Sequence, residues 1–256
     1  MQYTEGYLAF LDILGFSKFV EDESNGQATS DLFEFVKKFC FLFNTSPQLN
    51  VQVSFFSDTI IITADELENL VLPIYIAESY LKDNLGLLLR GAIVYGKYYH
   101  NEGTTFGPAV VAGYQLEKKA LYSRILLEDT VKVEGKNIFF FNDIDGHKCF
   151  NPYGVFFTEI MSSAPEGIVY PDNITKELID NFLTRRSELL AQINKYKGTT
   201  VIDKYLWRVR AFNHICDFVV KIPLGEVIYE EVTYVMNEQL QNQMRKMLIF
   251  ENEFMH

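Results

Sequence analysis

The chain has 256 residues, of which 48% are hydrophobic, and it carries a formal net charge of −11. This length allows one large domain, or one domain with a substantial appendage, and the apolar fraction allows a large buried core. The acidic balance argues against a broad nucleic-acid-binding surface, which requires clustered Lys and Arg. No apolar run is long enough to cross a bilayer and no signal peptide is evident, so we expect a cytoplasmic protein without a membrane partner.

The cysteines and histidines do not indicate a metal centre. The three cysteines are far apart and form no Cys-x-x-Cys pair, so reduced, buried thiols are expected. The four histidines lack the spacing of metal ligands, which argues against a zinc site.

The first third of the chain predicts a strand, a helix and a hairpin. Residues 7–13 form a short apolar run that is typical of a central strand. After a polar stretch, a helix is expected from an N-cap at Ser30. Residues 51–63 hold two β-rich runs on either side of Ser57-Asp58, which predicts a hairpin with these two residues at its turn. The apolar face of the helix would comprise Leu32, Phe35, Val36, Phe39, Cys40 and Phe43.

The next segments continue the alternation as far as about residue 129. A helix is predicted after Pro73, a strand over residues 86–96, a helix that begins at Gly107-Pro108, and a strand over residues 123–129. This order indicates an α+β fold of the ferredoxin-like, palm type, with a mostly antiparallel sheet and helices on one face.

The remainder of the chain has a different pattern and is expected to be a mostly helical appendage. We therefore divide the chain into a sheet domain, residues 1–149, and an appendage, residues 150–256, that packs on it. The tail is polar and rich in Gln and Asn. The expected elements are strands at 137–143, 153–159 and 225–236, and helices at 174–198 and 201–219.

Two acids interrupt apolar runs, Asp12 in the first strand and Asp58 at the hairpin turn. A buried carboxylate without a partner costs several kcal/mol or loses its charge. With the backbone carbonyl of Ile13, the two carboxylates could hold Mg²⁺ or Mn²⁺. The turn after Asp12 could also direct backbone N–H groups at an anion. That turn comprises Leu14, Gly15, Phe16 and Ser17. Taken singly, Asp58 also fits an ordinary turn and Asp12 a cap.

The motifs occur in an order that resembles the class III nucleotidyl cyclases, the adenylate and guanylate cyclase superfamily. Phe10-Leu11-Asp12-Ile13-Leu14-Gly15-Phe16 matches the Phe-x-Asp-[Ile/Leu]-x-Gly-Phe of that family. Ser57-Asp58 stands at the family's second metal carboxylate. Arg90 opens RGAIVYG, which is similar to Arg-x-Gly-[Ile/Val]-x-x-Gly, and Gly107-Pro108 begins the following helix. The resemblance covers about residues 5–130.

The resemblance implies a homodimeric enzyme that converts a nucleoside triphosphate into a cyclic nucleotide and pyrophosphate. Mg²⁺ or Mn²⁺ would be held by Asp12, Ile13 and Asp58, and Arg90 would bind phosphate. Lys97 is a second candidate for phosphate contact. In this family the base pocket and the metal site come from different subunits.

Several positions depart from the family pattern. The transition-state Asn and Arg of the family correspond to Val111 and Gln115, which cannot stabilise phosphoryl charge as a cation would. Lys118, Lys119 and Arg124 lie nearby in sequence and could substitute, although the lysines also fit a solvated helix face.

The base-reading positions correspond to Ser54 and Thr104, whose hydroxyl groups can both donate and accept hydrogen bonds. In this respect the chain resembles the pyrimidine cyclases of Pycsar antiphage systems, which make cyclic CMP or cyclic UMP.

Two other functions remain open at this stage. A cyclase-like domain that has lost turnover could serve as a nucleotide-binding or signalling module, which Val111 and Gln115 favour. A palm-type nucleotidyltransferase that joins two nucleotides ranks last, because the hairpin reads SFFSDT in place of Gly-Gly-[Asp/Glu]-Glu-Phe.

Overall fold

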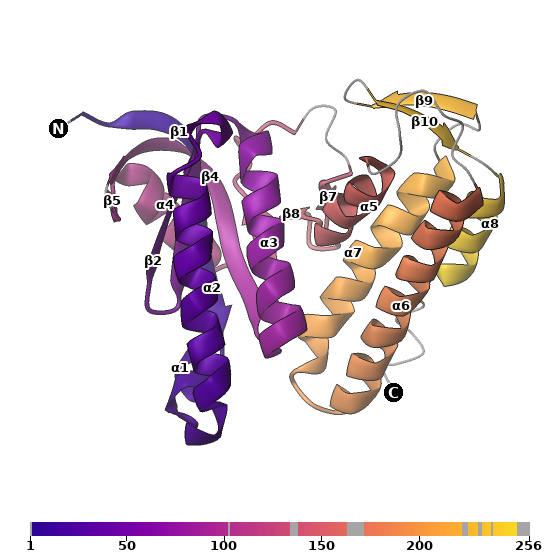
Figure 1. The fold of residues 1–256 in the computed structure, drawn as a ribbon, viewed down its shortest axis with the longest axis horizontal. Helices are drawn as coiled ribbons and strands as arrows, with labels where there is room; N and C mark the ends of the chain where they lie inside the picture. The colour runs from indigo at the N-terminus through magenta and orange to yellow at the C-terminus, as the bar shows by residue number, and fades with distance from the viewer. Residues whose placement is uncertain are drawn as a thin grey trace. The chain divides into compact units, whose positions relative to one another are not determined.

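The computed structural model describes residues 2–101, 103–133, 138–162, 172–221, 225–229, 232–236 and 238–249 (Figure 1). By its internal contacts the chain forms two compact units. The first comprises Met1–Gly135 and Asn142–Phe150, and the second comprises Lys136–Phe141 and Asn151–His256. Among the described helices, none combines the length and the apolarity that are needed to span a bilayer.

The first unit is built on a sheet in which β1 is central and antiparallel to both of its neighbours, β3 and β4. β4 pairs in parallel with β6, and β5 extends β4 as a short hairpin. In spatial order the strands are β2 (Val51–Phe56), β3 (Thr59–Ala64), β1 (Thr4–Leu14), β4 (Leu88–Asn101), β6 (Ile125–Leu127) and β8 (Lys148–Phe150), with β5 (Thr104–Phe106) beside β4. The predicted hairpin at Ser57-Asp58 is confirmed.

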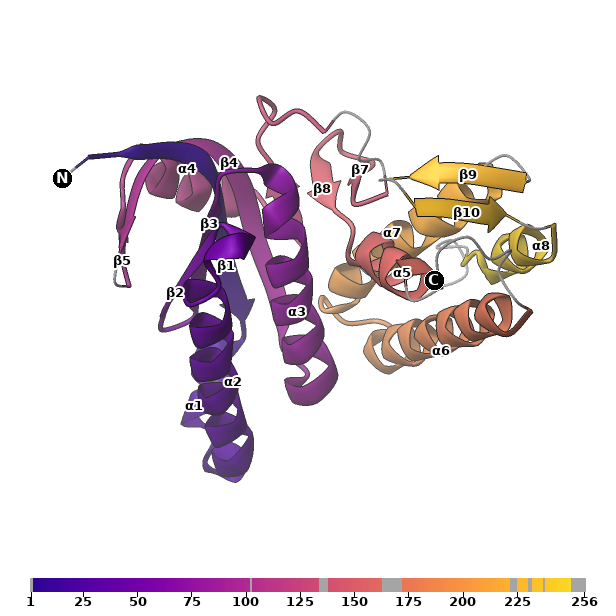
Figure 2. The ribbon, with the colours of Figure 1, turned by 45° about the horizontal axis from the view of Figure 1, so that its top comes forward.

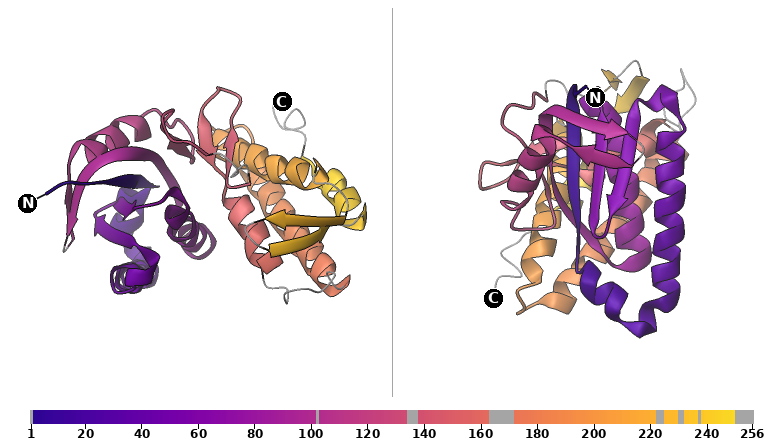
Figure 3. Two further views of the ribbon diagram at one scale, coloured as in Figure 1. Left: turned by 90° about the horizontal axis from the view of Figure 1, so that it is seen from above. Right: turned by 90° about the vertical axis from the view of Figure 1, so that its left-hand side faces the viewer.

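Helices cover both faces of this sheet. α2 (Gly26–Asn44) and α3 (Leu67–Leu85) lie on one face, and α4 (Pro108–Glu117) lies on the other (Figures 2 and 3). Because side chains alternate along a strand, Leu8 and Phe10 of β1 both point towards α4. Leu8 forms a buried cluster with Val94, Tyr98 and Ala109, against which Phe10 packs. The mixed α+β class is confirmed. The prediction of helices on one face only is wrong, because Ala109 and Gly113 let α4 pack closely on the second face.

Two helices begin earlier than the sequence predicts. α2 is preceded by a short helix, α1 (Phe16–Glu21), and a 3₁₀ turn, η1 (Glu23–Asn25). A second 3₁₀ turn, η2 (Pro47–Leu49), follows it. α2 begins at Gly26, so the Ser30 N-cap prediction is wrong; the Ser30 hydroxyl instead donates to the Gly26 carbonyl. α3 begins at Leu67 and contains Pro73 in its interior. Burial of its apolar residues on both sides of Pro73 outweighs the lost backbone hydrogen bond.

The second unit is mostly helical, as expected. Its helices are α5 (Pro152–Ser162), α6 (Asp172–Tyr196), α7 (Ile202–Lys221) and α8 (Glu238–Met247). β9 (Gly225–Tyr229) and β10 (Val232–Met236) pair antiparallel, so the single strand predicted at 225–236 is a hairpin. β7 (Phe140–Asn142) lies where the chain passes between the units. The polar tail includes α8, whereas 250–256 lie outside the described residues.

The strand predicted at 153–159 is wrong, because this segment belongs to α5. The Asn151 side chain accepts the Tyr153 N–H and Pro152 occupies the first turn, which together start a helix. Phe156 and Phe157 then pack against Phe182 of α6. A run of apolar residues fits a strand or a helix equally well by sequence, and burial among neighbouring helices decides between them.

Candidate functional site

The end of β1 and the β2–β3 turn meet at one point of the sheet. Asp12 pairs with Thr59 at the start of β3 and with Arg90 of β4. The Ile13 N–H donates to the Asp58 carbonyl at 2.8 Å, which fixes the turn beside the end of β1. Ser57 adopts a left-handed conformation, with φ of 56°, that closes this tight turn. The strand order therefore brings Asp12, Asp58 and Arg90 together.

Arg90 lies between two carboxylates, one of which was not predicted from the sequence. Its Nη2 is 3.2 Å from Asp12 Oδ2, and its Nε is 2.5 Å from Glu117 Oε1. Glu117 is the last residue of α4 and is only 4% exposed.

The approach of α4 to the sheet explains the position of Glu117. Ala109, Gly113 and Glu117 are spaced by four residues, so they share the face of α4 that meets β1 and β4. A Cβ at Gly113 would lie 2.9 Å from the Cβ of Phe10, so this close packing requires glycine. In the sequence, the small residues Ala109 and Gly113 precede Glu117 at intervals of four residues, and this pattern could have identified Glu117.

Burial and mutual repulsion act on the acids of this site. Burial raises the pKa of Asp12, Arg90 opposes that shift, and the Asp58 charge adds to it. Burial likewise raises the pKa of Glu117, with Arg90 opposing and Asp12 adding to the shift. In both carboxyl groups the charge of Arg90 therefore favours the ionised form, against the effects of burial and of the neighbouring carboxylate.

The residues present fit a divalent cation. A guanidinium already contacts the Asp12 carboxylate, so the position suits positive charge, and Asp58 lies beside it. Oxygen atoms of carboxylates and carbonyls are the ligands that Mg²⁺ prefers. Within the described part of the chain, no group of three or more His, Cys, Asp or Glu is arranged to hold a metal ion. Asp12 and Asp58 would consequently need oxygen atoms of the backbone, water or a substrate to complete the shell.

The turn that follows Asp12 forms as the sequence suggests. Gly15 has φ of 83°, which glycine adopts readily, and α1 begins directly after it at Phe16. The Phe19 N–H donates to the Gly15 carbonyl. Ile13 and Leu14 are the last residues of β1, and Ser17 lies in the first turn of α1. The binding of an anion by this segment stays a prediction.

The Ser54 hydroxyl lies beside that of Thr105, the neighbour of Thr104, and the reading of a base by Ser54 and Thr104 stays a prediction. The Ser54 and Thr105 hydroxyl oxygens are 2.9 Å apart, and Thr104 is exposed at the start of β5. Lys97 lies opposite Glu5 in the register of β1 and β4. It follows Arg90 by seven residues along β4, which at the rise of a strand separates their Cα atoms by on the order of 20 Å. Lys97 is therefore not part of the cluster around Asp12.

Two of the positions that depart from the pattern of the resembled family lie on the outer face of α4. Val111 and Gln115 are exposed there, and Lys118 stacks on the ring of Tyr114. Arg124, by contrast, is 1% exposed and forms ion pairs with Asp143 and Asp145. Arg124 is thus engaged in the interior of the first unit.

Comparisons with known proteins found solved structures that are similar to part of this chain in fold. No protein-family model matches the sequence, and a search of curated protein sequences found no significant match. The catalytic core of a rhodopsin-guanylyl cyclase with converted specificity, solved in complex with ATPαS, is 13% identical, with a TM-score of 0.42 over 59% of this chain and 98% of that one. An adenylate/guanylate cyclase/hydrolase from Silicibacter pomeroyi is 16% identical, with a TM-score of 0.39 over 58% of this chain and 96% of that one.

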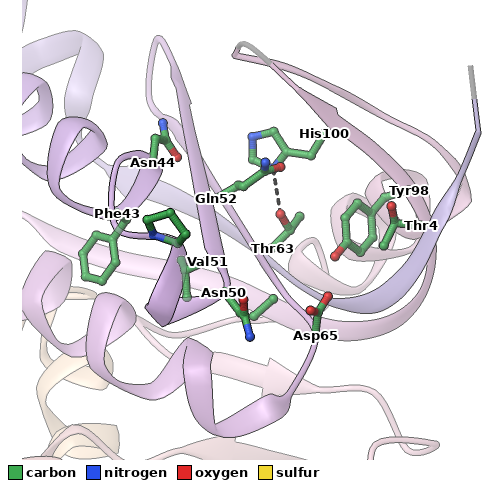
Figure 4. A pocket seen from close by; sticks show the side chains of 12 residues that line it. Thr4, Phe43, Asn44, Asn50, Val51, Gln52, Thr63, Asp65, Tyr98 and His100 are labelled. Carbon is green, nitrogen blue, oxygen red and sulfur yellow. Dashed lines mark hydrogen bonds between the residues drawn. The ribbon is translucent and has the colours of Figure 1, made fainter.

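A pocket of about 430 Å³ lies at the other end of the strands, where β1 begins and β3 ends (Figure 4). Thr4, Asp65 and Tyr98 are among the residues that line it. At its wall the Thr63 hydroxyl and His100 Nδ1 are 2.7 Å apart. The pocket shares no residue with the cluster around Asp12.

His100 is expected to make the protein less stable in mild acid. Burial lowers the pKa of His100 from 6.5 to about 4. Between these values the unfolded chain binds a proton at this position and the folded chain does not, so stability falls as the pH falls through this window. A His100→Gln variant should show a smaller loss of melting temperature between pH 6.5 and pH 4 than the unaltered protein. The same dependence of melting temperature on pH in both proteins would contradict a neutral, buried His100.

Proposed function

We propose that the chain is a nucleotidyl cyclase that converts a nucleoside triphosphate into a 3′,5′-cyclic nucleotide and pyrophosphate. The supporting observation is the convergence of Asp12, Asp58 and Arg90 at the end of β1. Under this proposal residues 1–149 form the catalytic domain, and residues 150–256 form an appendage to it.

Each residue of the cluster has a role in this reaction. Asp12, Asp58 and the Ile13 carbonyl would hold Mg²⁺ or Mn²⁺, which when bound polarises phosphate oxygens and favours ionisation of the ribose 3′-hydroxyl. Arg90 would contribute a charge-assisted contact to the triphosphate. The bond between the 3′-oxygen and the α-phosphorus forms as the bond to pyrophosphate breaks, and the hydroxyl proton leaves to solvent.

The substrate is proposed to be a pyrimidine nucleotide, with cyclic CMP or cyclic UMP as the product of an antiphage system. The supporting feature is the hydroxyl pair of Ser54 and Thr105, next to the predicted position Thr104. Hydroxyl groups can pair with either a donor or an acceptor of a base edge, without the charged partner that Lys or Asp would provide.

The direct test of this function is product identification. Purified protein is incubated with each of the four ribonucleoside triphosphates and Mn²⁺, and the products are identified by mass spectrometry, with an Asp12→Asn variant as the matched control. A cyclic nucleotide that is absent from the control supports the proposal. Joined dinucleotides would indicate a palm-type transferase instead, and the absence of any product would contradict the cyclase.

A homodimer is proposed as the active form. The supporting observation is that Phe56, Val111 and Tyr114 are large apolar side chains exposed on β2 and α4 of the first unit. Aromatic residues are enriched at interfaces between subunits. Sedimentation at micromolar concentration should show a dimer. A monomer that still turns over substrate would contradict a site shared between subunits.

A second candidate function is a cyclase-like nucleotide-binding module without turnover. It is favoured by Val111 and Gln115, which are neutral and exposed on α4 where the family pattern has Asn and Arg. Nucleotide binding measured by calorimetry, without any product in the assay above, would support this alternative.

A further inference from the structure

The guanidinium of Arg90 is held by two acids through different nitrogen atoms. Nη2 faces Asp12, and Nε faces Glu117. Glu117 comes from α4, whereas Asp12 and Arg90 come from adjacent strands. Glu117 is almost fully buried, whereas Asp12 is partly accessible to solvent. An incoming cation can therefore replace Arg90 at Asp12 more easily than at Glu117.

The charges around Arg90 do not balance within the cluster. Asp12, Asp58 and Glu117 bring three negative charges against the one positive charge of Arg90. The exposed Lys118 also acts on Glu117, and the cluster still keeps an acidic excess that favours a cation. A cation on the Asp12 carboxylate would repel the Arg90 guanidinium that contacts the same carboxylate. Metal binding would therefore disfavour the contact between Arg90 and Asp12.

We propose that Arg90 is the counter-ion of Asp12 in the metal-free protein, and that Glu117 is a positioning residue that retains Arg90 when a divalent cation takes its place. This inference rests on the proposed function. Glu117 would retain its contact with the Arg90 Nε atom. The Arg90 Nη atoms would then remain near Asp12 and could contact the triphosphate. Glu117 thereby gives Arg90 two positions, one on Asp12 and one available to phosphate.

The test is a double-mutant cycle on Mn²⁺ affinity, measured without nucleotide by electron paramagnetic resonance of free Mn²⁺. Arg90→Gln removes the competing cation, so Mn²⁺ should bind about fivefold more tightly. Glu117→Gln leaves Arg90 with Asp12 as its remaining partner, so Mn²⁺ should bind about fivefold more weakly. In the Arg90→Gln background, Glu117→Gln should change affinity by no more than about twofold. Glu34→Gln, an exposed acid on α2, controls for loss of net charge.

The outcomes separate this inference from the proposed function. Tighter binding by Arg90→Gln would not arise if Arg90 merely held Asp12 in place for a metal, because its loss would then weaken binding. Equal effects of Glu117→Gln in both backgrounds, or weaker binding by Arg90→Gln, would overturn the inference and leave the metal site intact. If the protein binds no Mn²⁺, or if the Mn²⁺ binding does not depend on Asp12 and Asp58, the proposed function and the inference are both overturned. Circular dichroism of each variant confirms that it is folded.

Discussion

Replacing Asp58 with asparagine is expected to reduce metal-dependent product formation by roughly 100-fold or more, because a metal contact contributes several kcal/mol to the reaction. The change keeps the shape of the side chain and removes the charge that a divalent cation requires. The Asp58 carbonyl, which accepts the Ile13 N–H, is unchanged, so the turn should persist. The measurement is the initial rate of cyclic nucleotide formation at saturating Mn²⁺.

Thermal stability provides the internal control for Asp58→Asn. The Asp58 charge raises the pKa of Asp12, so the two carboxylates repel in the metal-free protein. The melting temperature of the variant should therefore hold or rise. Undiminished turnover, or unfolding in the absence of any ligand, would show that Asp58 is a structural turn residue and would contradict the proposed mechanism.

Replacing Arg124 with methionine is expected to lower the free energy of unfolding of the first unit by about 3–5 kcal/mol, the usual result of removing one partner of a buried ion pair. Arg124 is 1% exposed and Asp143 is 5% exposed, so the variant would leave a buried carboxylate without its cation. Asp145 would lose the hydrogen bond from Arg124 that lowers its pKa. Urea denaturation followed by circular dichroism measures the change.

A surface ion pair in the same unit supplies the comparison for Arg124. Lys82 and Asp83 are 2.9 Å apart and partly exposed, so Lys82→Ala should cost no more than about 1 kcal/mol. A loss of the same size for both variants would mean that the Arg124 pair contributes no more than a solvated pair does.

Local patterns were sufficient to predict the elements that position the site. The apolar run before Asp12, the turn residues at Ser57-Asp58 and the Gly107-Pro108 helix start all occur where the sequence indicates. Each of these signals depends on neighbours within a few residues, through strand alternation, turn conformation or the fixed φ of proline. In the register that β1 and β4 adopt, Asp12 lies opposite Arg90.

The partners of the charged residues were not predictable in the same way. Glu117 reaches Arg90 because α4 packs closely on β1 at Gly113, and Arg124 meets Asp143 because a distant segment returns to the sheet. The contact between the Ser54 and Thr105 hydroxyls likewise depends on how β5 folds back on β4, which the sequence did not show.

The sequence alone determined the hairpin turn, the two acids Asp12 and Asp58, and the order of the main strands and helices in the first unit up to about residue 129, without the short α1 and β5. Those features follow from backbone preferences and hydrophobic periodicity, which act over short distances along the chain. Only the tertiary structure decided that residues 153–159 are helical, that Pro73 lies inside a helix and that Arg90 is shared between Asp12 and Glu117. These outcomes depend on burial and on the close approach of segments far apart in sequence, because packing energy outweighs local propensity and desolvated charges must find partners in space.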